Sequence, residues 1–134
     1  MRRLRARRFA KSKKGATAVE FALVSPLIFA AVLGTFEVGR ALYERNRVSA
    51  ACAAGARAVT INGAAAESAI EAAVRAKYHD AEQEDVAIDL TDETISGAAF
   101  KRIEVRYEHD LLIKFGKGVS GFTFTAVRYA PATS

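Results

Sequence analysis

An apolar segment near the amino terminus constrains this chain more than any other feature. Residues 16–36 contain a single ionisable side chain, Glu20, among apolar, small and hydroxyl-bearing residues. As a helix rising about 1.5 Å per residue, the segment is long enough to cross the roughly 30 Å hydrocarbon core of a membrane. It therefore predicts one transmembrane helix. Because Pro26 removes one backbone hydrogen bond from this helix, we expect a kink between Leu23 and Pro26.

The residues before this segment form a basic leader without an acidic side chain. Its eight cations are Arg2, Arg3, Arg5, Arg7, Arg8, Lys11, Lys13 and Lys14. Since positively charged flanks stay in the cytoplasm, the leader predicts a cytoplasmic amino terminus and an extracytoplasmic domain after Phe36. The whole chain has a net charge of +5, so the residues after the leader carry a net negative charge. The high isoelectric point is therefore poor evidence for nucleic-acid binding, and a nucleic-acid arm is a weaker interpretation of the leader than a topology signal.

One glycine joins the leader to the apolar segment. A secretory signal has its small-residue cleavage site after the apolar region, whereas Gly15 and Ala16 lie before it. Removal of residues 1–15 would leave Ala16 as a new amino terminus with the membrane helix intact, which is the arrangement of type IV prepilins. Glu20 lies near the start of the helix, and a carboxylate costs roughly 2.5–3.5 kcal/mol at a helix centre. Glu20 either has a function or only extends to the cytoplasmic headgroups.

Three segments of the amino-terminal third resemble the TadE-like pseudopilin family of tight-adherence (Flp-type) pilus systems. These segments are GATAVEFALVSPL at 15–27, GTFEVGRALY at 34–43 and AAGAR at 53–57. The resemblance covers about residues 15–57. It implies a minor pilin-like subunit that acts in pilus assembly, surface adherence and biofilm formation.

The resemblance also implies a processing site and a set of partners. Cleavage by a prepilin peptidase is expected after Gly15, with Gly15, Ala16, Glu20 and Phe21 forming the recognised site, and Glu20 is further implied in subunit assembly. The freed ammonium of Ala16 can neutralise Glu20 on the same or a neighbouring subunit. Other pilin-like subunits, inner-membrane assembly proteins and the lipid bilayer are the remaining expected partners. The implied location is the bacterial cytoplasmic membrane, as a single-pass protein, with incorporation into a surface pilus left open.

Beyond the membrane the helix is expected to continue to about residue 60, and a small domain follows. Small side chains allow close approach either to another subunit or to the protein's own outer domain, and both options remain open for Gly39, Ala50, Ala54, Gly55 and Ala58. Asn62 and Gly63 predict a turn. A second amphipathic helix is predicted from the helical spacing of Ile70, Ala73, Val74, Lys77 and Tyr78.

After an acidic loop the hydrophobic period changes to two, which predicts three strands. The first contains Val86, Ile88 and Leu90, the second Ile103, Val105 and Tyr107, and the third runs over 122–129. Residues 116–121 are interpreted as the connection before the last strand. The predicted fold class is α+β and type IV pilin-like: a cleavable leader at 1–15, a long helix at 16–60 that spans the membrane to about residue 36, and an extracytoplasmic domain at 61–134 with a second helix and a three-stranded antiparallel sheet, packed on the long helix.

Few residues are candidates for catalysis or metal binding. Cys52 is the only cysteine and the histidines are His79 and His109, so no paired-cysteine metal site or redox motif is possible. Cys52 is interpreted as a packing residue, with a cross-link between subunits left open. The acidic side chains between 80 and 93 could attract calcium but lack the spacing of a dedicated loop. We expect no enzyme, cofactor or metal; the alternatives are a signal-anchored extracytoplasmic binding protein with an intact leader and an exported enzyme.

Overall fold

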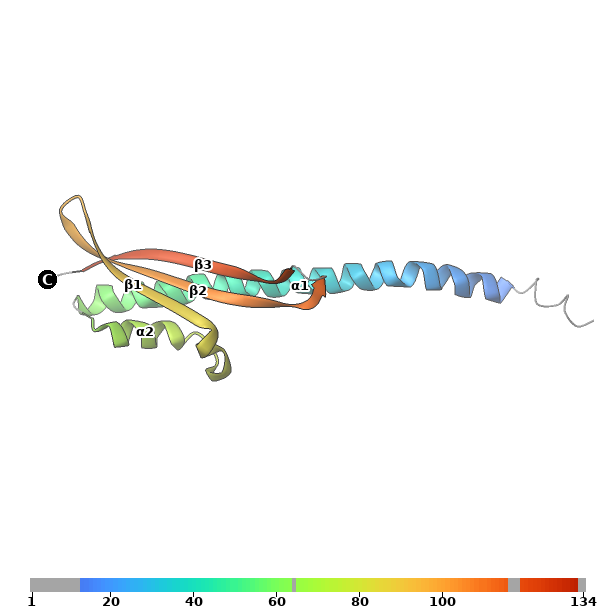
Figure 1. The fold of residues 1–134 in the computed structure, drawn as a ribbon, viewed down its shortest axis with the longest axis horizontal. Helices are drawn as coiled ribbons and strands as arrows, with labels where there is room; N and C mark the ends of the chain where they lie inside the picture. Colours follow the sequence, from blue (N-terminus) through green and yellow to red (C-terminus); the bar gives the residue numbers. More distant parts are fainter. Residues whose placement is uncertain (1–12, 64, 116–118, 133–134) are drawn as a thin grey trace, which may run out of the picture. The chain divides into compact units, whose positions relative to one another are not determined.

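The computed structural model describes residues 13–63, 65–115 and 119–132. They belong to two compact units, Met1–Val38 and Gly39–Ser134. The elements in chain order are α1 (Lys13–Asn62), α2 (Glu67–Arg75), the 3-10 helix η2 (Asp80–Asp85), β1 (Val86–Ile95), β2 (Ala98–Phe115) and β3 (Val119–Pro131) (Figure 1). A long amino-terminal helix, a short second helix and an antiparallel sheet confirm the predicted α+β class.

The three strands form one antiparallel sheet in the order β1-β2-β3, with β2 in the centre. The register places Tyr107 of β2 opposite Val86 of β1 on one side and opposite Phe124 of β3 on the other. The turn between β1 and β2 consists of Ser96 and Gly97, with φ values of 52° and 84°. Two consecutive positive φ angles are typical of the primed turns whose twist matches that of a hairpin.

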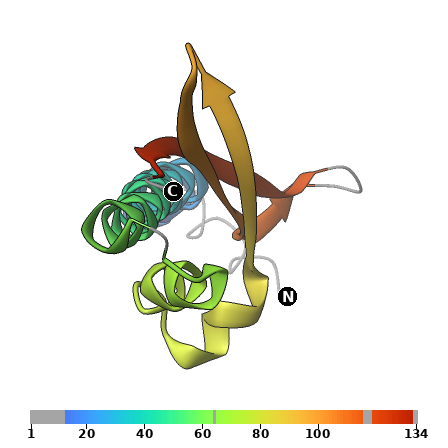
Figure 2. The ribbon, with the colours of Figure 1, turned by 90° about the vertical axis from the view of Figure 1, so that its left-hand side faces the viewer.

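The core of the second unit lies between the sheet and the two helices. The part of α1 after residue 39 and α2 cover the same side of the sheet (Figure 2). The fully buried side chains come from all of these elements: Val48, Cys52, Val59, Ile70, Val74, Ile103 and Val105. The alternation of buried Ile103 and Val105 with the polar side chains between them is the pattern of a strand with one packed face.

Gly55 lies where α1 packs closely against α2 and β2. A Cβ atom at this position would lie 2.9 Å from Val74 Cγ2 and 3.4 Å from both Ile70 Cγ2 and Ile103 Cγ2. Only glycine leaves room for these side chains, so Gly55 serves packing inside the chain. Gly39 is different, because a Cβ there would meet nothing within 4 Å.

The second helix is shorter than its periodicity predicts. It ends at Arg75, and the amides of Lys77 and Tyr78 bond the carbonyls of Val74 and Arg75, three residues earlier. These tighter bonds end the α-helix, so Lys77 is exposed, whereas Tyr78 enters the core from the turn. The predicted acidic loop is partly helical, since it contains η2.

The predicted connection at 116–121 is also shorter than expected. Residues 116–118 lie outside the described residues, and β3 already begins at Val119. Gly121 is a strand residue that pairs with Asp110 of β2. A Cβ on Gly121 would lie 2.6 Å from the carbonyl oxygen of His109, so this strand position requires glycine for steric reasons.

A cluster around Arg47 holds η2 and the preceding turn against α1. The guanidinium group of Arg47 bonds the carboxylate of Glu82, lies 3.3 Å from an oxygen of Glu44, and donates from Nε to the carbonyl of Lys77 at 3.3 Å. It also lies 4.6 Å from the ring centroid of Tyr78, which stacks on Tyr107 at 5.5 Å. Burial raises the pKa of Tyr78 to about 12. The Arg47 cluster thus combines ion pairs with a cation–π contact.

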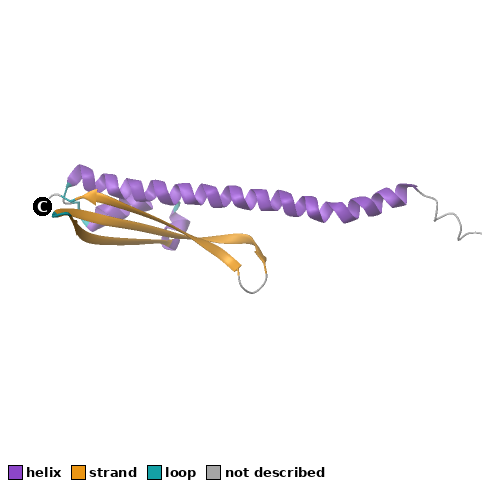
Figure 3. Ribbon diagram, turned by 90° about the horizontal axis from the view of Figure 1, so that it is seen from above, coloured by secondary structure: helices purple, strands orange, loops and turns teal. Residues whose placement is uncertain are grey.

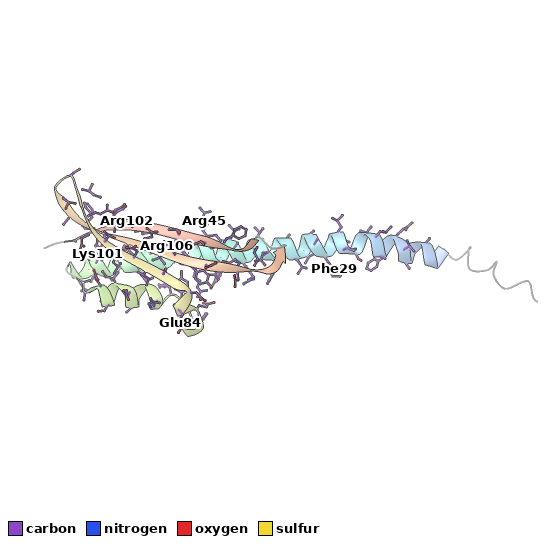
Figure 4. All side chains as sticks on the ribbon, viewed as in Figure 1. Phe29, Arg45, Glu84, Lys101, Arg102 and Arg106 are labelled. Carbon is purple, nitrogen blue, oxygen red and sulfur yellow. The ribbon has the colours of Figure 1, made fainter. Side chains whose placement is uncertain are left out.

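The side of the sheet that faces away from the helices carries a charged network, and Figure 4 labels two of its cations, Arg102 and Arg106. Arg106 lies 3.2 Å from Glu104 and 3.7 Å from Asp89, while Arg102 pairs with Glu104 and lies 3.7 Å from Glu93. The two pairs between β2 and β1, Arg106–Asp89 and Arg102–Glu93, support the register, but exposed ion pairs contribute only about 0–1 kcal/mol each. This face is solvated rather than packed.

Candidate membrane anchor and processing site

The residues predicted to form the processing site all lie on α1. The helix begins at Lys13, so Gly15 occupies its first turn rather than a loop in front of it. A Cβ on Gly15 would meet nothing within 4 Å. Among the described residues, no packing contact accounts for glycine at this position.

Glu20 and Phe21 follow one helical turn later. Glu20 is exposed, and 68% of the surface of Phe21 is accessible. Ala16 and Glu20 are four residues apart, so their side chains lie on one face of α1. The helix therefore brings Ala16 and Glu20 close together. Phe21 lies beside this pair in sequence, on the next helix position.

The rest of the first unit presents an apolar surface. Large hydrophobic side chains are exposed at Val19, Phe21, Leu23, Val24, Leu27, Ile28, Phe29, Val32, Leu33 and Phe36. Figure 3 shows α1 as a helix, and Figure 4 marks Phe29 on its surface. The helix continues through Pro26 without interruption, and the predicted kink at this position stays a prediction.

The hydroxyl group of Thr35 on this surface is also compatible with a hydrocarbon environment. The hydroxyl of Thr35 donates to the carbonyl of Ala31 at 2.9 Å, so its hydrogen-bonding capacity is met within the helix. By length and composition, α1 contains one candidate membrane span among the described residues, and its apolar part is not buried. Exposed apolar patches of this size mark an interaction with a membrane or a partner.

The second unit contains the residues considered for catalysis. Cys52 is fully buried, and its thiol donates to the carbonyl of Ile103 at 3.3 Å and approaches that of Ala126 at 3.6 Å. Burial raises the pKa of the Cys52 thiol, which lowers the fraction of reactive thiolate. His109 is buried beside Phe124, while His79 is exposed at the start of η2. The position of Cys52 fits packing and not nucleophilic chemistry or a cross-link in the folded chain.

Three of the acidic residues between 80 and 93 pair with three different cations. Glu82 bonds Arg47, Asp92 lies 2.8 Å from Lys101, and Asp89 pairs with Arg106. Within the part of the chain that the structure describes, no three His, Cys, Asp or Glu side chains are placed to hold a metal ion. The Arg47 cluster was not foreseen from the sequence, because charge types alone do not identify the partners.

Residues 15–57 match the family model of TadE-like proteins. The match begins at the predicted cleavage glycine and confirms the resemblance over the predicted range. It covers about a third of the chain, including the exposed apolar part of α1 and most of the part of α1 that packs in the second unit. Comparison with curated proteins and with solved structures found no match. The TadE-like segment therefore relates this chain to pilus-associated pseudopilins, and its apolar helix indicates membrane anchoring.

Proposed function

We propose that the chain is a minor pseudopilin of a tight-adherence type IV pilus system, acting in pilus assembly, surface adherence and biofilm formation. The observation that carries this proposal is the position of the TadE-like segment: its start coincides with Gly15, and its first half coincides with the exposed apolar surface of α1. The chain is anchored in the cytoplasmic membrane, with its leader inside and Gly39–Ser134 outside.

The proposed processing step is cleavage by a prepilin peptidase between Gly15 and Ala16. The absence of any contact that a Cβ on Gly15 would make supports an external reason for glycine, namely close approach of the peptidase to the backbone. Cleavage frees the ammonium group of Ala16 one turn before Glu20, on the same face of α1. This cation compensates the Glu20 carboxylate as apolar helices of neighbouring subunits pack.

The amino terminus of the mature protein tests the processing step. Protein isolated from native membranes should begin at Ala16, as determined by mass spectrometry of its terminal peptide. Gly15→Val should accumulate the uncleaved precursor, whereas Gly34→Val, also at an open position of the same helix, should be processed normally. A native chain that retains its leader would favour the signal-anchored binding protein instead.

Substitution of Glu20 tests the assembly role. Glu20→Gln removes a charge that opposes burial in the membrane, so insertion should persist while adherence and co-purification with other pilin-like subunits fall. Glu20→Asp keeps the charge and should retain part of both activities. If Glu20→Gln is cleaved and supports normal adherence, the carboxylate has no role in assembly.

Topology is tested separately with reporters fused after Ser134. An exported reporter should be active and a cytoplasmic reporter inactive, because the basic leader holds the amino terminus inside. The reverse result would reject the proposed orientation.

We further propose that the chain is not an enzyme, since the buried Cys52 thiol is bonded to backbone carbonyls and lacks the exposure of a nucleophile.

A further inference from the structure

The sheet of the second unit has two unpaired edges. In the described sheet β1 and β3 each pair only with β2, so the outer backbone groups of both strands have no strand partner. Such an edge is a template for pairing with another chain. Strand β3 is long, with 13 residues, and its exposed hydrophobic side chains are Phe122, Val127 and Tyr129, which are 50%, 40% and 47% accessible. It lacks the short length that often protects an edge, and Arg128 is its only charged residue.

The two edges differ in charge. Among its residues β3 has one cation, Arg128, and no acid, whereas β1 has three acids, Asp89, Asp92 and Glu93, and no cation. Arg128 is exposed and forms no ion pair with the described residues. The β3 edge therefore complements an acidic strand, and the opposite edge of the same sheet is such a strand.

We propose that β3 of one copy pairs with β1 of a second copy, extending the sheet, with Arg128 beside Asp92 of the neighbour. In β3 the side chains of Ala126 and Ala130 face the helices, so Arg128, two residues from each, projects on the same side. In β1, Ile88 and Leu90 face the helices, and so does Asp92. Asp92 pairs with Lys101 in its own chain, yet its side chain remains 74% exposed and open to a second cation.

Strand lengths favour a parallel arrangement. With Asp92 opposite Arg128 and the strands parallel, all of β1 (Val86–Ile95) lies beside 122–131 of β3. An antiparallel arrangement around the same pair would run past Pro131 and leave the first residues of β1 without a partner. The parallel register also keeps the helices of both copies on one side of the sheet.

The contact is heterologous, because it joins two different edges. Each added copy presents a free edge of its own, so association does not close at a dimer and produces a row of subunits. The proposal does not depend on leader cleavage, and goes beyond the proposed function by naming the surface and the partner.

Disulfide cross-linking of the full chain in its membrane tests the register. In a Cys52→Ala background, Thr91→Cys and Val127→Cys are placed opposite each other between copies, and both native residues are exposed. Within one copy these positions lie on the two outer strands, about 9–10 Å apart or more, so an intramolecular disulfide is excluded. Mild oxidation should give a ladder of dimers, trimers and larger species.

Four controls give the experiment its specificity. Thr94→Cys with Val127→Cys is three residues out of register and should give little cross-linking. Arg128→Glu in the Thr91/Val127 cysteine background should reduce the ladder by about fivefold, because it places like charges opposite each other. Arg128→Lys should preserve it. Either cysteine alone should give no species larger than a dimer.

Specific outcomes overturn the proposal. Equal ladders from the in-register and out-of-register pairs would mean random collision. Strong dimers from Val127→Cys alone would indicate pairing of two β3 strands. A chain that keeps its native near-ultraviolet circular dichroism and yields no ladder would exclude the contact altogether.

Discussion

The guanidinium group of Arg47 and the carboxylate of Glu82 join α1 to η2 across 35 residues of sequence. The side chain of Arg47 is only 10% exposed, while that of Glu82 is 32% exposed. Glu44 supplies the second carboxylate of the Arg47 cluster, three residues before Arg47 on the same helix. A charge with so little exposed surface needs such partners, so the Arg47 cluster fixes η2 and, through it, the start of β1.

Glu82→Gln should therefore destabilise the second unit by about 1–2 kcal/mol, since it leaves Arg47 with one carboxylate and Glu82 is partly solvent-screened. The free energy of unfolding is measured by urea titration of the detergent-solubilised chain, followed by near-ultraviolet circular dichroism of Tyr78 and Tyr107. The matched control is Glu84→Gln, at an exposed neighbouring position, which should change stability by less than about 0.5 kcal/mol. Equal effects of the two substitutions would contradict the role of the pair.

The same pair predicts a dependence of stability on pH. The hydrogen bond from Arg47 lowers the pKa of Glu82 below its ordinary value of 4.5. The carboxylate is then more easily ionised in the folded than in the unfolded chain, so its stabilisation is complete above pH 4.5 and is lost as pH falls through the lower, folded-state pKa. The difference in unfolding free energy between wild type and Glu82→Gln should shrink from about pH 6 to about pH 3. A constant difference would show that ionisation of Glu82 is not involved.

Gly55→Ala should destabilise the second unit by about 1–2 kcal/mol, because the added methyl group overlaps Val74 in a filled core. This cost exceeds the gain from the higher helix propensity of alanine. Gly39→Ala is the control on the same helix. Its added methyl group meets nothing, and stability should rise by up to about 1 kcal/mol. Thermal unfolding of both variants measures the two effects, and a stabilising Gly55→Ala would mean that α2 moves away at little cost.

Cys52 should react slowly with a maleimide reagent in the folded chain, because its thiol is buried and burial raises its pKa. Unfolding in urea should restore rapid labelling. Ala50→Cys in a Cys52→Ala background provides an exposed cysteine on the same helix and should react rapidly under both conditions. Rapid labelling of native Cys52 would show that the core opens readily.

The sequence predicted the elements whose patterns follow directly from burial. Ile103, Val105 and Tyr107 alternate because one side of β2 packs on helices and the other is solvated. The end of α2 was not predictable from periodicity, because Tyr78 keeps its buried position although the chain has already left the helix. The Arg47–Glu82 pair also escaped prediction, since several acids near η2 could equally have paired with Arg47.

The candidate processing site, in contrast, can be recognised from the sequence but not from the fold. Gly15 and Glu20 are recognisable from the order of leader, glycine and apolar segment, whereas their surroundings in the folded chain are much like those of Leu23 or Phe29, which are also exposed on α1. Their proposed roles depend on a peptidase, on other subunits and on lipid. Roles that depend on other molecules are encoded in the sequence, but the fold of a single chain does not reveal them.

Helix α1 contributes Val48, Ala51, Cys52 and Val59 to the core of the second unit. No linker precedes this core, because the unit begins at Gly39 inside an unbroken helix. A protease that cut near residue 39 would release the second unit with its core complete. A cut a few turns further on would remove α1 side chains from that core, and the released fragment would unfold. Release of a natively folded second unit is thus restricted to cuts within a narrow stretch of helix.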